Sequence, residues 1–241
     1  MYTMDNYPFS LYGDLGSFID KDTLSYLGSG CNNHVWKLDR EQGVFAVKTF
    51  INREFCMKSE LYHKMKNLEL QQTLKAMEVF KRSDSPYDMD AYMMQYLDED
   101  SNFSLFDFPT AMLLENFSKI EQDANMLADN HIIMCDVDIS NSIYDQLTSQ
   151  LYISDIDCFY SDDTLPSFRI LDRNYSLIMD LFVDYLSKDL GKSDLSSFDK
   201  ASYITQLHEL FDDNFVEESP CDKIEKVLGK YKTPRQYFAK K

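Results

Sequence analysis

At 241 residues the chain is long enough to bury a sizeable hydrophobic core, as one large domain or two small ones. Hydrophobic residues make up 44% of the sequence, which indicates a globular protein and not a disordered one. The formal net charge of −17 argues against nucleic acid and anionic membranes as main partners, because both require a basic protein surface.

The five cysteines are spaced neither as a C-x-x-C motif nor as zinc ligands, so we expect reduced thiols at Cys31, Cys56, Cys135, Cys158 and Cys221. The first residues include Asp5 and Asp14 and contain no apolar signal segment. No run approaches the roughly 20 apolar residues of a membrane span. We therefore expect a soluble, cytoplasmic protein with no membrane partner.

The first regular pattern is a pair of alternating segments, His34–Asp39 and Gly43–Phe50, which predict two strands joined by a turn at Asp39–Gly43. Thr23–Leu27 precedes them and leads into Gly28-Ser29-Gly30. A Gly-x-Gly at this place can lay backbone amides over phosphates, although by itself it is more often only a turn.

Two further residues add to this pattern. Val35 lies seven positions after Gly28, and Lys48 ends the string Ala46-Val47-Lys48 on the second strand. Lys48 is the candidate for contacting nucleotide phosphates. Taken alone, it would be read as a solvated lysine on a strand edge.

A helical pattern follows from Asn52 to Met77, with Asn52 as its cap and Glu60 within it. Thr73–Lys81 is either a further strand or an extension of that helix. Asp84–Asp88 predicts a turn, and Asp90–Leu97 predicts a buried strand.

The second half begins with a polar and aromatic linker at Asp98–Pro109, followed by a clear amphipathic helix at Thr110–Asp129. Three more helices are expected further on, at Tyr175–Leu186, Lys200–Phe211 and Asp222–Tyr231. A solvated acidic run at Asp212–Glu218 separates the last two.

Between these helices, two apolar runs each lead to an aspartate. His131–Cys135 leads to Asp136, and Leu151–Ser154 leads to Asp155, with Asn141 in the polar turn between them. Carboxylate and amide oxygens are the ligands that a hard divalent cation prefers. These side chains converge if Ile139–Tyr144 and Leu151–Ser154 pair as short strands.

Taken in order, these motifs resemble those of the protein kinase superfamily. LGSG…V…AVK resembles the Gly-rich loop and the strand lysine. Met134-Cys135-Asp136, with Asn141 five residues after the aspartate, resembles H-R-D-x-x-x-x-N. Asp155-Ile156-Asp157 resembles D-F-G. The resemblance covers residues 27–155 and depends on the order and spacing of degenerate motifs.

The resemblance implies an α+β, two-lobed protein-kinase-like fold that uses ATP and Mg²⁺. Residues 1–97 would form a β-rich N-lobe with one helix, and residues 98–241 a shortened, mainly α C-lobe.

The same resemblance assigns roles to single residues. Asp136 would accept or orient the hydroxyl proton of the acceptor, and Lys48 would hold phosphate. Glu60 would pair with Lys48, with Glu54 and Glu69 as alternatives. The remaining assignments are the nucleotide contacts Gly28, Gly30, Val35, Gln95 and Leu97, and the metal ligands Asn141, Asp155 and Asp157.

The chain also departs from the family pattern. Asn33 stands for the third glycine of the loop, and asparagine tolerates a left-handed backbone. Met134 and Cys135 replace the histidine and arginine of the catalytic loop, so regulation by activation-segment phosphorylation is not expected. Asp138 stands where Ser/Thr kinases carry lysine. The helix at Tyr175–Leu186 lacks the aspartate that kinases use to hold this loop.

Four readings follow from these observations. The first is an atypical Ser/Thr protein kinase with a protein as phosphate acceptor. The others are a small-molecule kinase of the aminoglycoside or choline type, a pseudokinase that serves as a binding or scaffold module, and a purely structural helical interaction protein. Nucleotide binding without turnover would separate the pseudokinase from the enzymes. The oligomeric state stays open.

Overall fold

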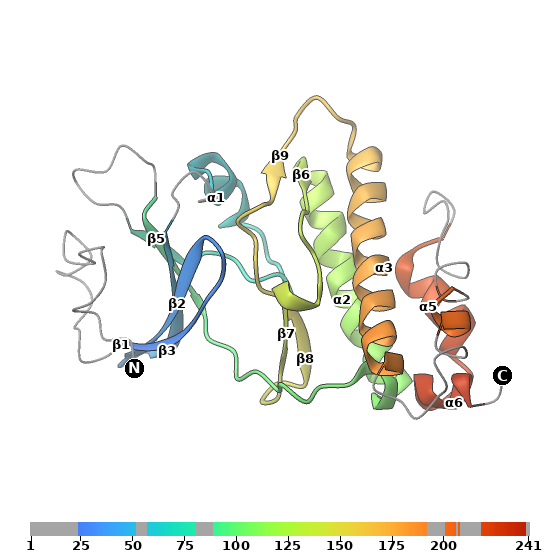
Figure 1. Cartoon of the computed structure of the whole chain (residues 1–241). Helices are drawn as coiled ribbons and strands as arrows, with labels where there is room; N and C mark the ends of the chain where they lie inside the picture. Colours follow the sequence, from blue (N-terminus) through green and yellow to red (C-terminus); the bar gives the residue numbers. More distant parts are fainter. Residues whose placement is uncertain are drawn as a thin grey trace. The chain divides into compact units, whose positions relative to one another are not determined.

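The computed structural model describes residues 24–51, 57–80, 89–191, 201–205, 207 and 218–239. The chain has a mixed α+β architecture and divides into two compact units (Figure 1). Unit 1 comprises Met1–Leu68, Leu74–Leu97 and Ile156–Cys158; unit 2 comprises Glu69–Thr73, Asp98–Asp155 and Phe159–Lys241. The α+β class is as expected, whereas the two-lobed kinase-like arrangement stays a prediction.

The boundary expected after residue 97 is also a boundary between the two units. Two short segments do not follow that single division, because residues 69–73 belong to unit 2 and residues 156–158 to unit 1.

Unit 1 contains a five-stranded antiparallel sheet in the order β1-β2-β3-β5-β4. Its strands are β1 Leu24–Ser29, β2 Asn33–Arg40, β3 Gly43–Phe50, β4 Glu78–Phe80 and β5 Ala91–Gln95. The predicted hairpin is confirmed: β2 and β3 pair along their whole length up to Arg40 opposite Gly43. Gly43 has a φ of 138°, which explains why a residue without a Cβ stands there.

One face of this sheet carries the hydrophobic core of unit 1. Trp36 and Leu38 on β2 alternate with more exposed neighbours, as the period of two in a strand requires. They pack with Val47, Phe80, Ala91 and Met93 from the other strands.

The long helix expected from Asn52 to Met77 is wrong for its second half. Helix α1 covers only Ser59–Met65, and of the two alternatives for Thr73–Lys81 the structure has the strand, limited to β4 at Glu78–Phe80. Lys75 donates from Nζ to the carbonyls of Lys66 and Leu68, just after the helix ends. The amides of residues 71–73 donate to a side chain of α2, so they are not available for helical bonds. Asn52, Glu54, Cys56 and the turn at Asp84–Asp88 lie outside the described residues.

Unit 2 is built on two long helices, α2 at Thr110–Asp129 and α3 at Ser167–Gly191, which lie side by side in Figure 1. Helix α2 has the predicted bounds, whereas α3 is longer than the predicted Tyr175–Leu186. The Phe117 and Phe182 rings meet edge to face with centroids 5.4 Å apart.

Shorter elements complete the described part of unit 2. They are η5 Leu105–Asp107, α5 Pro220–Leu228 and α6 Pro234–Phe238, together with helical residues 201–205. Between the long helices the chain forms two small two-stranded sheets: β6 Ile132–Ile133 pairs with β9 Tyr160–Ser161, and the hairpin strands β7 Ser142–Asp145 and β8 Gln150–Ile153 pair with each other. The expected pairing around Asn141 is therefore confirmed, with η6 at Ile139–Asn141 in place of the first strand residues.

Side chains of α2 hold the neighbouring extended segments. The buried carboxylate of Asp123 accepts hydrogen bonds from the amides of Gln71, Gln72 and Thr73 at 2.6–2.7 Å. Burial raises the pKa of Asp123, against the opposing effect of these amides. About two turns earlier in the helix, Asn116 Oδ1 accepts the amide of Leu151 on β8 at 2.7 Å.

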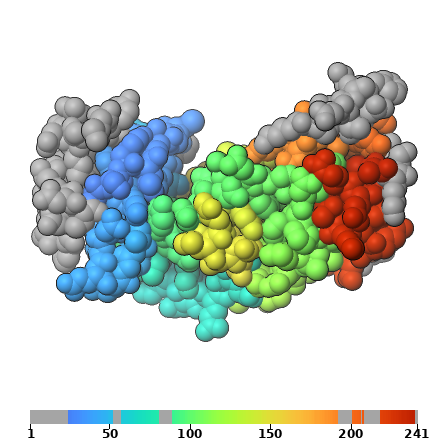
Figure 2. All heavy atoms as spheres, turned by 90° about the horizontal axis from the view of Figure 1, so that it is seen from below, coloured from blue at the N-terminus to red at the C-terminus, as the bar shows by residue number. Residues whose placement is uncertain are grey.

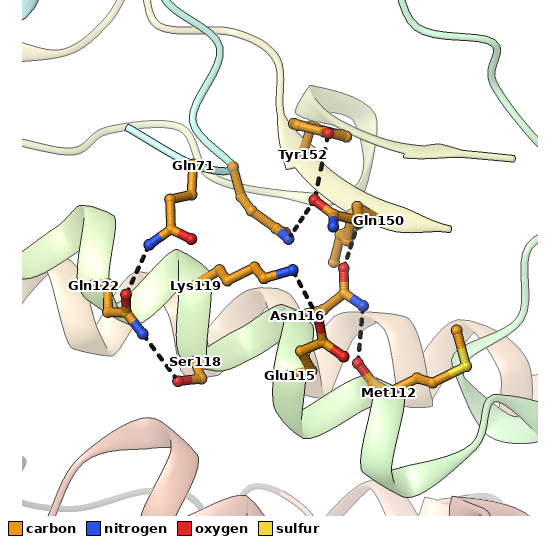
Figure 3. Close-up of polar contacts among 11 residues, drawn as sticks. Gln71, Met112, Glu115, Asn116, Ser118, Lys119, Gln122, Gln150 and Tyr152 are labelled. Atoms are coloured by element: carbon orange, nitrogen blue, oxygen red, sulfur yellow. Dashed lines mark hydrogen bonds and ion pairs between the residues drawn. The ribbon is translucent and has the colours of Figure 1, made fainter. Parts of the chain in front are cut away.

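Figure 3 shows this side of α2. Gln122 accepts a hydrogen bond from the side chain of Gln71, and Asn116 points toward the strand that carries Gln150. The segment 71–73 and β8 are thus both fastened to one helix.

The β7–β8 hairpin is also bonded to the segment that follows β5. Asp145 is buried, and its carboxylate accepts the amide of Asp98 at 2.8 Å and the amide and hydroxyl of Thr148. The turn of the hairpin, coloured yellow in Figure 2, lies at the surface of unit 2.

Within the described residues, no helix combines the length and the apolar character needed to cross a membrane. Cys31, Cys135, Cys158 and Cys221 form no disulfide.

We expect Asp123→Ala to destabilise the protein by at least about 3 kcal/mol, because three amides lose their acceptor at once. The measurement is the free energy of unfolding in urea. Asp129→Asn is the matched control: it changes an exposed carboxylate at the end of the same helix, and should stay within about 0.5 kcal/mol of wild type. Equal effects of both variants would contradict this account.

Asp145 should make stability depend on pH. Burial acts to raise the pKa of Asp145, but the bonds from Thr148, Asp98 and Leu147 outweigh it and hold the pKa below its ordinary value of 3.8. Because the folded state holds the proton less tightly, this contribution is present above pH 3.8 and is lost as the pH falls through the depressed pKa. The difference in unfolding free energy between wild type and Asp145→Asn should shrink over that window, measured by urea titrations at each pH.

Candidate functional site

In unit 1 the strand register brings three of the predicted nucleotide contacts together. Gly28 on β1 lies opposite Val35 on β2, and Val35 lies opposite Lys48 on β3. A β-bulge between Tyr26 and Gly28 sets this register. The spacing in the sequence suggests that Gly28, Val35 and Lys48 belong together. In the sheet they are direct neighbours on three adjacent strands.

Gly30 and Asn33 form the bend between β1 and β2. The amide of Gly30 donates to the carbonyl of Asn33 at 3.0 Å, and a Cβ on Gly30 would come within 3.2 Å of Asn33 Oδ1. Asn33 is not among the residues with a positive φ, so the left-handed backbone considered for it is not adopted. It starts β2 in an extended conformation instead.

Lys48 is buried and forms an ion pair with Asp157, with Nζ 2.5 Å from Oδ2. The two side chains are only 4% and 6% exposed. Both residues belong to unit 1, because residues 156–158 are part of it. Lys48 therefore lies inside unit 1. It is not the solvated lysine on a strand edge that the residue taken alone would suggest.

The pair of Lys48 with Glu60 is not present among the described residues. Glu60 lies on α1 with its side chain 69% exposed, and it pairs with Lys64 of the same helix at 3.8 Å. Glu60 is the second residue of α1 and faces solvent in the first turn of the helix. Glu69, the other described alternative, is exposed and belongs to unit 2.

The residues expected to border an adenine lie at the end of β5. Gln95 is exposed and pairs with Phe45 of β3, and Leu97 is buried two residues later. They follow Tyr92, the β5 neighbour of Lys48, along the same strand. Their nucleotide contacts stay a prediction.

In unit 2 a tight loop joins β6 to β7 and carries Asp136. Asp136 is exposed and has a φ of 56°, a left-handed conformation that few residues other than glycine adopt. Its carbonyl accepts a hydrogen bond from Asn141 Nδ2 at 2.9 Å. Asp138 Oδ1 accepts from the amide of Asn141 at 3.0 Å and from Ser140 Oγ at 2.6 Å. The loop is thus fixed by its own polar side chains.

Asn141 connects this loop to Asp155. The carbonyl of Asn141 accepts the amide of Ser154 at 2.8 Å, and Asp155 is the next residue. Unit 2 therefore brings Asp136, Asn141 and Asp155 into one neighbourhood, as expected from the pairing of β7 and β8. Asp157 is not part of it, since it belongs to unit 1, where it pairs with Lys48.

The donor set in unit 2 is compatible with Mg²⁺. Asn141 uses Nδ2 for the bond to Asp136, which leaves the amide oxygen as a ligand, and Asp155 supplies a carboxylate. Mg²⁺ is typically bound by one or two protein oxygens and completes its shell with water and phosphate oxygens. A group of three or more His, Cys, Asp or Glu side chains that could hold a metal does not occur among the described residues.

The loop is anchored from α3 by Asn174, which the sequence analysis missed. Asn174 is fully buried; its Oδ1 accepts the amide of Met134 at 2.9 Å, and its Nδ2 donates to the carbonyl of Ile132 at 3.2 Å. The resemblance to kinases places an aspartate, and not an asparagine, near the start of this helix to hold the loop. The available signal was the spacing Ile170, Asn174, Ile178, which places a polar residue on the buried face of the helix.

Cys135, between Met134 and Asp136, packs against the cluster of Ala128, Ile133 and Ile170. Burial raises the pKa of the Cys135 thiol and Asp136 adds to this, while Arg173 opposes it. The thiol is therefore protonated at neutral pH and serves as a packing residue, and not as a nucleophile.

No protein-family model matches this chain, and no curated protein matches it.

We expect Asn174→Ala to destabilise the protein by about 2–4 kcal/mol, because one buried amide loses its acceptor and one carbonyl its donor. The more specific effect is local: hydrogen exchange of the Met134 amide should accelerate at least about tenfold. Asn130→Ala, which removes an exposed amide bonded to Met126 at the end of α2, is the control. An unchanged exchange rate at Met134 would show that Asn174 does not hold the loop.

Proposed function

We propose that the chain is an ATP- and Mg²⁺-dependent phosphotransferase with a protein-kinase-like fold. The observation that carries this proposal is the buried lysine of β3. Lys48 lies opposite Val35, which itself lies opposite Gly28, and it pairs with an aspartate that follows β8.

The energetics of this ion pair favour a functional over a structural explanation. Removing two charges from water costs several kcal/mol per ion, and a well-packed apolar pair is often as stable or more stable. Unit 1 has an apolar core on the other side of β3, around Val47. A lysine on this sheet and an aspartate in the segment 156–158, both buried, are expected where the charge itself is needed.

The loop of unit 2 supports the proposal independently. Asp136 is exposed in a strained left-handed backbone, and its position is fixed by Asn141, Asp138 and the anchor Asn174. Backbone strain of this kind costs about 1–3 kcal/mol and tends to occur where a side chain must be presented in a set direction.

The roles follow from the chemistry of each group. Phosphoryl transfer depends mainly on positioning and on neutralising negative charge. Lys48 would hold phosphate oxygens, Asp136 would accept or orient the proton of an acceptor hydroxyl, and Asn141 and Asp155 would hold Mg²⁺. The metal would supply further positive charge beside the phosphates.

Two observations favour alternatives. Cys135 is half-buried against an apolar cluster where the family carries arginine, which favours a nucleotide-binding scaffold without turnover. Only residues 158–166 lie between Asp157 and α3, and such a short segment favours a small-molecule acceptor.

Thermal unfolding with ATP and Mg²⁺ tests the proposal. Ligand that binds only the folded state at about 100 times its Kd stabilises it by about 2.7 kcal/mol. For a chain of this size we expect the melting temperature to rise by about 5 °C or more. The shift should be lost in Asp155→Ala and Lys48→Met, and retained in the control Asp129→Asn.

Phosphate transfer to protein and small-alcohol acceptors then separates the readings. A shift with transfer supports the enzyme, and a shift without transfer to any acceptor supports the scaffold. Absence of a shift in wild type at millimolar ATP would overturn both.

A further inference from the structure

The start of α3 carries a surface of aromatic and cationic side chains, which we call the α3 surface. It consists of Tyr160 on β9 and Phe168, Arg169 and Arg173 on α3. Phe168 is 63% exposed and Tyr160 is 38% exposed. The guanidinium of Arg169 lies over the Phe168 ring, 5.5 Å from its centroid. Arg173 Nη1 donates to the hydroxyl of Tyr160 at 3.4 Å.

These two arginines differ from the others that the structure describes. Arg40 pairs with Glu78 at 3.2 Å, and Arg235 pairs with Asp107 through two bonds. Among the described residues, neither Arg169 nor Arg173 has a carboxylate within ion-pair distance, although the chain contains 41 acidic and only 24 basic residues. The chain is rich in carboxylates, yet Arg169 and Arg173, one helical turn apart and both exposed, form no ion pair with a described carboxylate. Their guanidinium groups are therefore available to an external anion.

The α3 surface lies next to the loop that presents Asp136. Tyr160 pairs with Ile133 of β6, and Asn174, the neighbour of Arg173, holds the amide of Met134. In Figure 1, β6 and β9 lie side by side near the first turns of α3. The charge of Arg173 also reaches Cys135, where it lowers the thiol pKa against the larger effect of burial.

We propose that the α3 surface binds an acidic, extended segment of a protein partner, with an apolar side chain on Phe168 and carboxylates on Arg169 and Arg173. Aromatic residues and arginine are enriched in protein interfaces and dominate their binding energy. Because the surface adjoins Asp136, this segment belongs to the phosphate acceptor, a part of the inference that rests on the proposed function.

The acidic groups nearby define where such a segment can lie. The Asp162 carboxylate accepts the hydroxyl and amide of Thr164, and these bonds lower its pKa, with a smaller contribution from the charge of Arg173. Asp172 lies between the two arginines in the sequence, directly before Arg173, and Asp136 lies in the neighbouring loop. Carboxylates of the partner can therefore bind only at the guanidinium groups of Arg169 and Arg173. The partner residues that contact the remainder of the α3 surface must be uncharged.

A binding experiment tests the surface without any nucleotide. The probe is a fluorescein-labelled peptide with glutamates around one leucine and one serine, and its counterpart carries lysines in place of the glutamates. Fluorescence anisotropy should show binding of the glutamate peptide to wild type and much weaker binding of the lysine peptide. The double variant Arg169→Ala/Arg173→Ala and the single variant Phe168→Ala should each raise Kd by at least about fivefold.

Matched controls come from the same unit. Lys188→Ala removes a cation near the other end of α3, and Leu147→Ala removes an apolar side chain that is 80% exposed. Neither should change the affinity. Equal binding of both peptides, or equal effects of control and surface variants, would overturn the proposal. So would a dimer, detected by sedimentation, that Phe168→Asp dissociates, because a second copy would then occupy the surface.

The outcome is separable from that of the proposed function. Peptide binding without a nucleotide-induced thermal shift would keep the surface and refute the kinase. With ATP and Mg²⁺, dephosphorylated casein, an acidic protein, should be a better phosphate acceptor than histone, and the double arginine variant should abolish this preference while leaving the thermal shift by ATP unchanged.

Discussion

Buried backbone amides need acceptors, and in unit 2 the long helices supply them from their side chains. Asp123 and Asn116 of α2 accept four amides from residues 71–73 and β8, and Asn174 of α3 accepts that of Met134. Asp189, near the end of α3, accepts the amide of Phe106 in η5. Each of these segments is too short to satisfy its own backbone in a sheet. The irregular parts of unit 2, including the loop with Asp136, therefore owe their positions to a few polar residues on otherwise apolar helix faces.

The buried polar groups of unit 1 have a different role. The central strands of its sheet pair with one another along the backbone, and a buried ion pair joins Lys48 of β3 to Asp157 in the segment 156–158. A pair that is costly to bury and is not required for hydrogen bonding of the backbone is the part of unit 1 most plainly suited to binding a charged ligand. In unit 2 the equivalent feature is the left-handed Asp136, whose strain is balanced by bonds from Asn141.

The sequence predicted the elements whose pattern is local. The apolar stripe of Thr110–Asp129 predicted α2 with its bounds, alternation predicted β2 and β3, and the buried strand predicted at Asp90–Leu97 is β5. It failed where a distant group decides the local structure: residues 71–73 have helical periodicity, but the carboxylate of Asp123 takes their amides. For the same reason Asn174 was missed, since its partner Met134 lies 40 residues away. The partner of Lys48 was sought on a helix by analogy with a family, and the sequence alone does not show that α1 ends at Met65.

The β7–β8 hairpin determines the spacing of two of the candidate metal ligands. Strand β7 begins immediately after Asn141, and β8 ends two residues before Asp155, with Ser142 opposite Ile153. A shift of one residue in this pairing would move Asp155 by about 3.4 Å relative to Asn141 and turn every β8 side chain to the other face. An insertion at the exposed tip around Leu147 leaves the pairing intact, whereas an insertion within either strand does not. The two strands must therefore keep their residue count, whereas a longer tip has to preserve the bonds that Asp145 accepts from Thr148.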